Sequence, residues 1–366
     1  MEGPPGQERV SGTMTMLTGR GRGSRKKKKS MKKVLVVTSL IVGSWGAASG
    51  CTDEGKAGDT TSGRTSGSAA STGSGGMGGA GGGPAIDPSD LNALVAGGYV
   101  ELSWMTSSKP ASRIVRVENT MPSGPDDPMA TVVYEGAGAK ASEPLRNLVA
   151  TTKEAPRTYH YAVYGCDAPG SCGGGPATAE LEVTLGQALV GGGYNMVFRH
   201  AAADVCEDAF ELGTAAETSS PGWWKSCDSN CVTATARQLN AQGVSQAEQM
   251  GIAIKDRGFP FGRVLASEFC RCMRTAELMN LGPMVEENQG ITGFAYDEAG
   301  RCAATMALAA EAPAPGTNGA LVGHSGHQCG VLDALAWGEA AVYKPDGKGG
   351  AIYITRVDSS AWAALP

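Results

Sequence analysis

Residues 194–200 read Tyr-Asn-Met-Val-Phe-Arg-His, a short apolar run that ends in an arginine and a histidine. Two similar apolar runs follow at 262–267 and 319–323, and His324 comes directly after the second of them. Between the runs, apolar residues recur with the spacing of a helix face, at 245–258, 268–280 and 297–310. Strands that alternate with helices predict a mostly parallel sheet covered by helices on both faces, an α/β three-layer sandwich.

Polar side chains stand at the end of each predicted strand. Arg199 and His200 end the first, Ser267 ends the second with Arg271 four residues later, and His324 follows the third. Because sites collect at the carboxyl ends of parallel strands, these side chains are expected to meet. Arginine presents a fork of donors that matches phosphate oxygens, and a neutral imidazole is a good nucleophile near neutral pH. The set therefore predicts phosphoryl transfer to a histidine without a metal or cofactor.

Four stretches resemble, in order, the signature of the histidine phosphatase superfamily (phosphoglycerate mutase-like, branch 1). They are Phe-Arg-His-Ala at 198–201, Thr-Ala-Arg-Gln-Leu-Asn-Ala-Gln-Gly at 235–243, Ser-Glu-Phe-Cys-Arg-Cys-Met-Arg-Thr-Ala-Glu-Leu at 267–278 and Leu-Val-Gly-His at 321–324. The resemblance implies that residues 190–366 form a histidine phosphatase domain. It also implies that His200 is the phosphorylated nucleophile, that Arg199, Arg271 and His324 bind the phosphate, and that water then hydrolyses the phosphohistidine.

Two features depart from the family pattern. After the histidine the family usually has glycine and glutamate, whereas this chain has Ala201 and Ala202. No clear motif marks the acid that gives a proton to the leaving oxygen. Asp297 and Glu298 lie at about the family's distance after Arg271, and Asp297 is the predicted proton donor. The alternatives are Glu286, Glu287 and Asp204.

Residues 85–187 have the pattern of short strands with proline and glycine clusters between them, which predicts an all-β sandwich. The expected strands are 99–104, 114–117, 131–134, 158–164 and 179–185. The strands around Trp104 and His160 resemble those of fibronectin type III modules, and a generic immunoglobulin-like sandwich is the alternative. Both residues are interpreted as structural, and the module as a spacer rather than an adhesive unit.

The first 84 residues predict export. Lysines at 26–33 precede an uncharged, mostly apolar run at 34–50 and then Cys51, the order of a secretory signal peptide with a start at Met31. The ending Ala-Ser-Gly-Cys resembles the lipobox of bacterial lipoproteins, which implies that Cys51 is lipidated; a signal-anchor helix is the alternative. Residues 51–84 are a glycine- and serine-rich tether. The expected location is extracytoplasmic, on the periplasmic or surface face of the cell envelope.

Cysteine usage agrees with an oxidising compartment, because the chain has 10 cysteines. Cys166 and Cys172 are expected to form a local disulfide. Seven cysteines remain downstream, so at least one must be a free thiol; they are Cys206, Cys227, Cys231, Cys270, Cys272, Cys302 and Cys329. Their spacings lack a pair of Cys-x-x-Cys motifs, and disulfides are therefore preferred to a zinc site.

The charge of the chain limits its partners. The whole chain of 366 residues has a formal charge of -5. Removal of residues 1–50, with ten basic and two acidic residues, leaves 21 Lys and Arg against 34 Asp and Glu, a formal charge of -13. An acidic protein is a poor partner for nucleic acid. The prediction is a metal-independent phosphomonoester hydrolase for a small phosphorylated substrate, which touches the membrane through its lipid anchor only. The alternative is a catalytically silent phosphate-binding or surface adhesion lipoprotein; a glycolytic mutase fits an exported chain badly.

Overall fold

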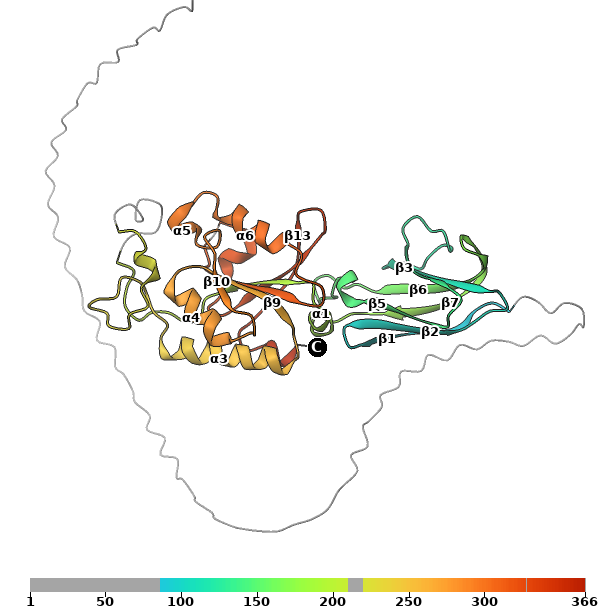
Figure 1. Cartoon of the computed structure of the whole chain (residues 1–366), viewed down its shortest axis with the longest axis horizontal. Coiled ribbons are helices and arrows are strands. Elements are labelled where there is room, and N and C mark those ends of the chain that lie inside the picture. Colours follow the sequence, from blue (N-terminus) through green and yellow to red (C-terminus); the bar gives the residue numbers. More distant parts are fainter. Residues whose placement is uncertain (1–85, 210–219, 327, 366) are drawn as a thin grey trace, which may run out of the picture. The chain divides into compact units, whose positions relative to one another are not determined.

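The computed structural model describes residues 86–209, 220–326 and 328–365 (Figure 1). The predicted signal segment at 1–50, the lipidated Cys51 and the tether to residue 84 concern residues outside these ranges. Within the described ranges, no helix is long and apolar enough to cross a membrane.

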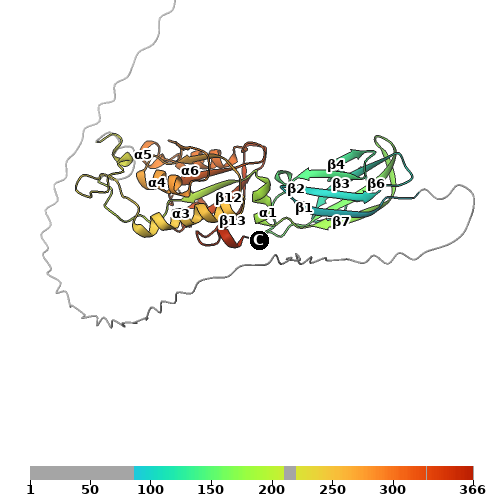
Figure 2. The ribbon, with the colours of Figure 1, turned by 60° about the horizontal axis from the view of Figure 1, so that its bottom comes forward.

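Seven strands between residues 89 and 181 form two antiparallel sheets (Figure 2). One sheet has the order β1-β2-β5 and the other the order β4-β3-β6-β7. The strands are β1 (Ser89–Ala96), β2 (Tyr99–Met105), β3 (Ala111–Glu118), β4 (Thr131–Gly136), β5 (Lys140–Pro144), β6 (Tyr159–Ala168) and β7 (Ser171–Leu181). Strands β1 and β5 were not predicted, because neither alternates cleanly between buried and exposed residues.

The core of this β-sandwich comes from alternate residues of the strands. In β2, Val100, Leu102 and Trp104 are buried, while their neighbours face outward. The Trp104 ring packs on Tyr134 with 5.4 Å between ring centroids, and its Nε1–H donates to Ser112 Oγ at 3.2 Å. Trp104 is therefore a core residue, as expected from the sequence.

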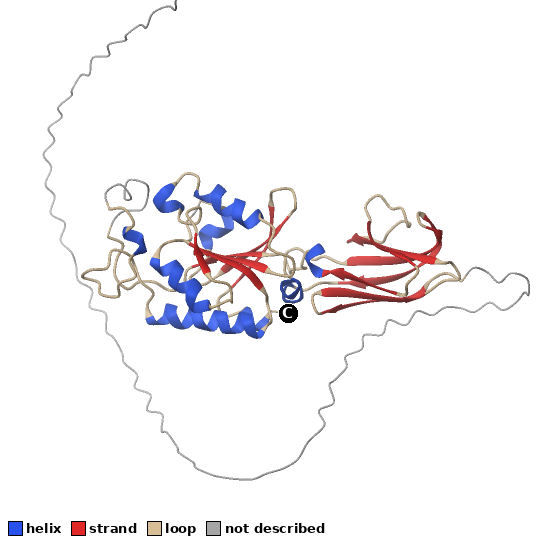
Figure 3. Ribbon diagram, viewed as in Figure 1, coloured by secondary structure: helices blue, strands red, loops and turns tan. Residues whose placement is uncertain are grey.

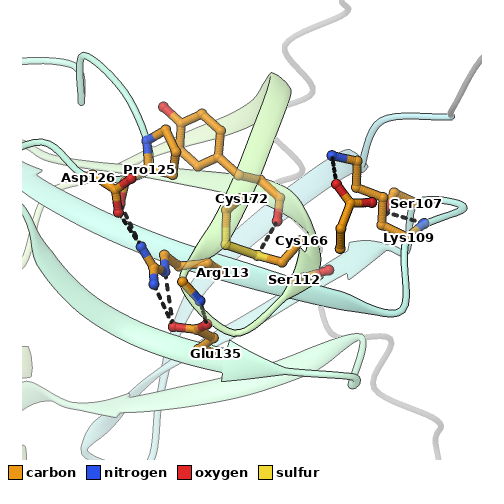
Figure 4. Close-up of a disulfide and its surroundings, with 12 residues drawn as sticks. Ser107, Lys109, Ser112, Arg113, Pro125, Asp126, Glu135, Cys166 and Cys172 are labelled. Atoms are coloured by element: carbon orange, nitrogen blue, oxygen red, sulfur yellow. Dashed lines mark hydrogen bonds and ion pairs between the residues drawn. A yellow bond between two sulfur atoms is a disulfide. The ribbon is translucent and has the colours of Figure 1, made fainter.

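The outer part of the four-stranded sheet is held by a disulfide and ion pairs (Figure 4). Cys166 and Cys172 are joined across the β6–β7 hairpin. Arg113 on β3 pairs with Glu135 on β4 at 2.9 Å and also with Asp126. Because Asp126 lies in the long β3–β4 connection, these pairs attach that connection to the sheet.

The last predicted strand of the sandwich, 179–185, extends too far. Strand β7 ends at Leu181, and Thr184 begins helix α1 (Leu185–Gly191). The Thr184 hydroxyl accepts from the amide of Gln187, whose side chain accepts from the Thr184 amide. This capping box stabilises a helix start that apolar spacing alone did not reveal.

The C-terminal region contains a six-stranded sheet with the order β10-β9-β11-β8-β12-β13. The first four strands in this order are parallel, and β12 and β13 are antiparallel to their neighbours. The strands are β8 (Asn195–Arg199), β9 (Phe261–Ala266), β10 (Val285–Glu287), β11 (Asn318–Gly323), β12 (Ala340–Pro345) and β13 (Ala351–Val357).

Helices cover both faces of this sheet, and they give it the predicted three layers (Figures 1 and 3). Helices α3 (Ala241–Asp256) and α4 (Cys270–Met279) lie on one face, while α5 (Gly293–Tyr296) and α6 (Arg301–Ala310) lie on the other. Along β8, Met196 and Phe198 belong to the core on the α3–α4 side, and Val197 belongs to the core on the other side. Short 3-10 helices complete the elements: η1 (Leu145–Asn147), η2 (Trp223–Lys225), η3 (Gly330–Ala334) and η4 (Trp362–Ala364).

Two of the predicted helices start four residues away from their expected first residue. Helix α3 starts four residues earlier than expected, because the Asn240 side chain accepts from the Gly243 amide and caps the helix. The helix expected at 297–310 starts only at Arg301, because residues 297–300 form a turn in which Asp297 accepts from the Gly300 amide.

Candidate active site

Three parallel strands end side by side at the candidate site. Gly323, the last residue of β11, pairs with Arg199 at the end of β8, and Val322 pairs with Ala266 at the end of β9. The residues that follow these strands therefore lie at the same edge of the sheet. The structure brings His200, Ser267 and His324 to this edge, as the strand pattern predicted.

His200 is buried, with 4% of its surface exposed. Its backbone amide donates to the Gly323 carbonyl at 2.9 Å, and its Nδ1 lies 2.8 Å from the Ala201 carbonyl oxygen. A carbonyl can only accept, so Nδ1 carries the proton and Nε2 keeps its lone pair. No group in residues 86–209, 220–326 and 328–365 hydrogen-bonds to Nε2. The ring meets His324 edge-on, with 5.4 Å between centroids.

The surroundings of His200 hold it neutral. Burial lowers the pKa of His200 well below its ordinary value near 6.5, and the positive charges of Arg271, Arg199 and Arg237 lower it further. A neutral imidazole with a free Nε2 lone pair is a nucleophile, and three cations around it favour an anion as its ligand.

Arg271 is the most deeply buried of these arginines, with 1% of its side chain exposed. It lies on the first turn of α4, and its Nη1 donates to Asp208 Oδ1 at 3.0 Å. Its guanidinium also lies over the Phe269 ring, 4.4 Å from the centroid. The carboxylate and the ring together fix the orientation of the guanidinium fork.

Arg199, at the end of β8 directly before His200, is half-buried. Its Nη1 donates to the Leu335 carbonyl at 2.8 Å, and its guanidinium lies 5.6 Å from the centroid of the Trp337 ring. Burial lowers the pKa of Arg199, and the neighbouring charge of Arg237 contributes. The guanidinium remains the charged form that an oxyanion requires.

His324 is held by the residues of the next strand end. Its Nε2 lies 3.0 Å from Ser267 Oγ, and its ring meets Phe269 edge-on with 4.8 Å between centroids. The thiol of Cys272 lies 3.5 Å from the same Nε2. Burial raises the pKa of Cys272 to about 12, so this free cysteine stays protonated and is not a nucleophile.

The loop after His200 is fixed by α3 and α4. Thr275 Oγ1 accepts from the Ala201 amide at 3.0 Å, and Gln246 Oε1 accepts from the Ala202 amide at 3.1 Å. Gly243 on α3 packs so closely that a Cβ there would lie 2.0 Å from the Ala202 oxygen. Ala201 and Ala202 are thus buried packing residues.

A buried carboxylate, that of Glu268, anchors the segment 223–225 beside the site. Its Oε2 accepts from Trp224 Nε1 at 2.9 Å and from the Tyr296 hydroxyl at 2.7 Å, and its Oε1 pairs with Lys225 at 3.2 Å. Trp223 and Trp224 are both buried, and their rings pack on Phe269. Both tryptophans therefore pack against the site.

The predicted proton donor lies apart from these residues. Asp297 is exposed on the turn before α6, and its carboxylate accepts from the Gly300 amide at 2.9 Å. No contact between described residues links it to His200, Arg271 or His324. The three alternative acids, Glu286, Glu287 and Asp204, are also exposed; Glu287 pairs with Lys225, and Asp204 accepts from Asn240.

Sequence reasoning missed Asp208, Glu268 and the position of Arg237. Arg237 lies in the stretch 235–243, for which the sequence indicated no function of this arginine. Its guanidinium pairs with Asp208 at 3.2 Å. Asp208 and Arg237 are 29 residues apart, so no local spacing could reveal the pair. Glu268 follows Ser267 directly, and only its burial shows its importance.

Three disulfides lie in the described part of the C-terminal region. They join Cys206 to Cys231, Cys227 to Cys270 and Cys302 to Cys329. The first two connect the segment between His200 and α3 to itself and to the residue before Arg271. Oxidation therefore holds the Asp208 segment against the site.

No protein-family profile matches the chain, and no curated protein matches it in sequence. Several solved structures are similar to part of it. A SixA from Agrobacterium tumefaciens is 17% identical, with a TM-score of 0.31, and the similarity covers 45% of this chain and 98% of that one. A protein histidine phosphatase SixA complexed with tungstate is 17% identical, with a TM-score of 0.31, and the similarity covers 45% of this chain and 97% of that one. A phosphoserine phosphatase from Entamoeba histolytica, in complex with 3-phosphoglyceric acid, is 12% identical, with a TM-score of 0.30. That similarity covers 46% of this chain and 98% of the other.

Proposed function

We propose that residues 190–366 form a histidine phosphatase domain that hydrolyses phosphate monoesters through a phosphohistidine at His200. The observation that carries the proposal is the hydrogen bond from His200 Nδ1 to the Ala201 carbonyl at 2.8 Å. It leaves Nε2 as a nucleophile, and the positive charges of Arg271 and Arg199 act on the same buried ring. A buried neutral imidazole surrounded by cations is suited to attack a bound phosphoryl group.

In the first step, Nε2 attacks phosphorus, the P–N bond forms and the ester P–O bond breaks. Arg199, Arg271 and His324 receive the three non-bridging oxygens, on which the transition state spreads its charge. The Ala201 carbonyl accepts from Nδ1–H and stabilises the positive charge that the imidazole ring acquires. In the second step, water attacks phosphorus, the P–N bond breaks, and inorganic phosphate leaves. The arginines supply the positive charge, so these steps use no metal ion or cofactor.

The proposal does not assign the leaving-group proton to Asp297, because its exposed carboxylate is bonded to the Gly300 amide. The leaving oxygen takes its proton from water in this scheme. An aryl phosphate, whose phenolate leaves readily, is therefore the best first substrate. We expect Asp297→Asn to keep the wild-type rate with 4-nitrophenyl phosphate.

The decisive variant is His200→Ala. Removal of the nucleophile should lower kcat for 4-nitrophenyl phosphate by at least about a thousandfold. His160→Ala is the matched control, because His160 lies on β6 of the sandwich and pairs with Glu180. Acid-labile, base-stable labelling of His200 by a ³²P-labelled substrate would show the intermediate. Undiminished turnover by His200→Ala would refute the mechanism, and a wild-type chain that binds phosphate without turnover would favour the silent binding protein.

We further propose that the domain acts outside the cytoplasm, on a lipid anchor at Cys51, with the sandwich as a fibronectin type III-like spacer. Four disulfides among the described residues support an oxidising compartment. Mass spectrometry of the mature chain should find an acylated N-terminal Cys51. An intact Met1 or Met31 at the N-terminus would contradict the anchor.

A further inference from the structure

The Asp208 carboxylate lies between two arginines. Its Oδ1 accepts from Arg271 Nη1 and from the backbone amide of Arg237, each at 3.0 Å. Its Oδ2 accepts from Arg237 Nε at 3.3 Å and pairs with Arg237 Nη2 at 3.2 Å. One carboxylate therefore sets the spacing between the two guanidinium groups.

The two arginines differ in exposure. Only 1% of the Arg271 side chain is exposed, whereas 37% of the Arg237 side chain is. The backbone beside Arg237 is nevertheless fixed, since Gln238 pairs with Val205 and its side chain donates to the Ser226 and Ala236 carbonyls. Arg237 thus combines a rigid attachment with a guanidinium that a ligand from solvent can reach.

The charges near His200 do not balance. Asp208 joins Arg237 to Arg271. Together with burial, the positive charge of Arg237 lowers the pKa of Arg271, His200 and Arg199. Of the carboxylates in the described ranges, Asp208 is the one paired with this group of three arginines. Three positive charges against one negative charge, with His200 neutral, leave two charges for a ligand to neutralise. A phosphate monoester dianion carries two negative charges and balances them, whereas a phosphate diester carries only one negative charge.

We propose that Arg237 is a further phosphate-binding residue at the mouth of the site, and that Asp208 is the positioning residue that holds Arg237 and Arg271 at a fixed distance. Hydrolysis of a phosphate ester bound there rests on the proposed function, whereas binding of the phosphate by Arg237 does not. Arg237 meets the incoming dianion first and then shares its oxygens with Arg271. Asp208 gives both guanidinium groups their orientation before the ligand arrives, which lowers the cost of binding.

Titration of the full chain with tungstate, a tetrahedral oxyanion, tests the binding by calorimetry. Arg237→Gln should weaken tungstate binding at least tenfold. The control is Arg274→Gln, which removes an exposed arginine that pairs with Glu277 one turn away and should change the affinity less than twofold. An Arg237→Gln protein that binds tungstate within twofold of wild type would overturn the inference.

The positioning role of Asp208 needs a measurement that a loss of folding would not mimic. Asp208→Asn should weaken tungstate binding. The tungstate affinity of the double variant Asp208→Asn/Arg237→Gln should lie within threefold of that of Arg237→Gln, because Asp208 acts partly through Arg237. If the losses of tungstate binding free energy in the two single variants add fully in the double variant, and the thermal unfolding midpoints are unchanged, Asp208 does not position Arg237. With 4-nitrophenyl phosphate, Arg237→Gln should raise KM about tenfold and change kcat less than threefold.

The outcomes separate this inference from the proposed function. A wild-type chain that binds tungstate through Arg237 but hydrolyses nothing would refute the phosphatase and leave the binding site intact. A wild-type chain that hydrolyses aryl phosphate with no effect of Arg237→Gln on KM would refute the inference alone.

Discussion

Removal of the buried carboxylate of Glu268 should destabilise the fold around the site. Glu268 is 4% exposed and accepts from the indole N–H of Trp224, which is 1% exposed. In Glu268→Ala the indole N–H loses its acceptor, which costs about 1–3 kcal/mol. The lost hydrogen bond from Tyr296 adds about 0.5–1.5 kcal/mol. The ion pair with the more exposed Lys225 adds roughly 0–1 kcal/mol.

These contributions predict a loss of about 3 kcal/mol in the free energy of unfolding of Glu268→Ala. Glu268→Gln keeps an acceptor for Trp224 but loses the charge, so we expect about 1–2 kcal/mol. Urea titrations of the oxidised protein, followed by tryptophan fluorescence, measure both values. The control is Glu277→Ala, because the exposed pair of Glu277 with Arg274 should contribute less than about 1 kcal/mol.

The order of the three variants in their free energy of unfolding is the decisive result. If Glu268→Ala loses no more stability than Glu277→Ala, the buried hydrogen bonds of Glu268 do not stabilise the site and the reasoning fails. If Glu268→Gln is as unstable as Glu268→Ala, the charge is the whole effect and the acceptor geometry is unimportant.

Other predictions concern pH, packing and redox state. His200 has a folded pKa well below 6.5, so it binds a proton more readily in the unfolded chain; its contribution to stability is complete above pH 6.5 and is lost as the pH falls toward the folded pKa. Urea midpoints of wild type and His200→Gln should therefore converge between pH 7.5 and 5, and a constant difference would argue against a buried neutral His200. Gly243→Ala should cost about 1–3 kcal/mol, because its Cβ would lie 2.0 Å from the Ala202 oxygen; Gly124→Ala, with no atom within 4 Å, should change the unfolding midpoint little. Reduction of the Cys206–Cys231 and Cys227–Cys270 disulfides should lower aryl phosphate hydrolysis severalfold, and reoxidation should restore it. Full activity after complete reduction would show that the segment between His200 and α3 needs no covalent anchor.

The architecture of the C-terminal region could be predicted because its signals are local. The apolar runs that became β8, β9 and β11 are short and end at polar residues, and helical spacing fills the gaps between them. A parallel sheet brings the ends of such strands to one edge, so His200 and His324 meet there whatever the details of the loops. The helix starts were less predictable, because side-chain caps at Thr184 and Asn240 set them.

The sequence by itself thus determined the alternation of three parallel strands with helices and the meeting of His200, Arg271 and His324 at the sheet edge. Only the tertiary structure decided which charges act on them. Asp208 reaches Arg271 across 63 residues, Glu268 gains its partners by burial, and Asp297 faces solvent. The physical reason is that strand and helix periodicity is written over a few neighbouring residues, whereas the desolvation and pairing of a charge depend on chain segments that only folding and disulfides bring together.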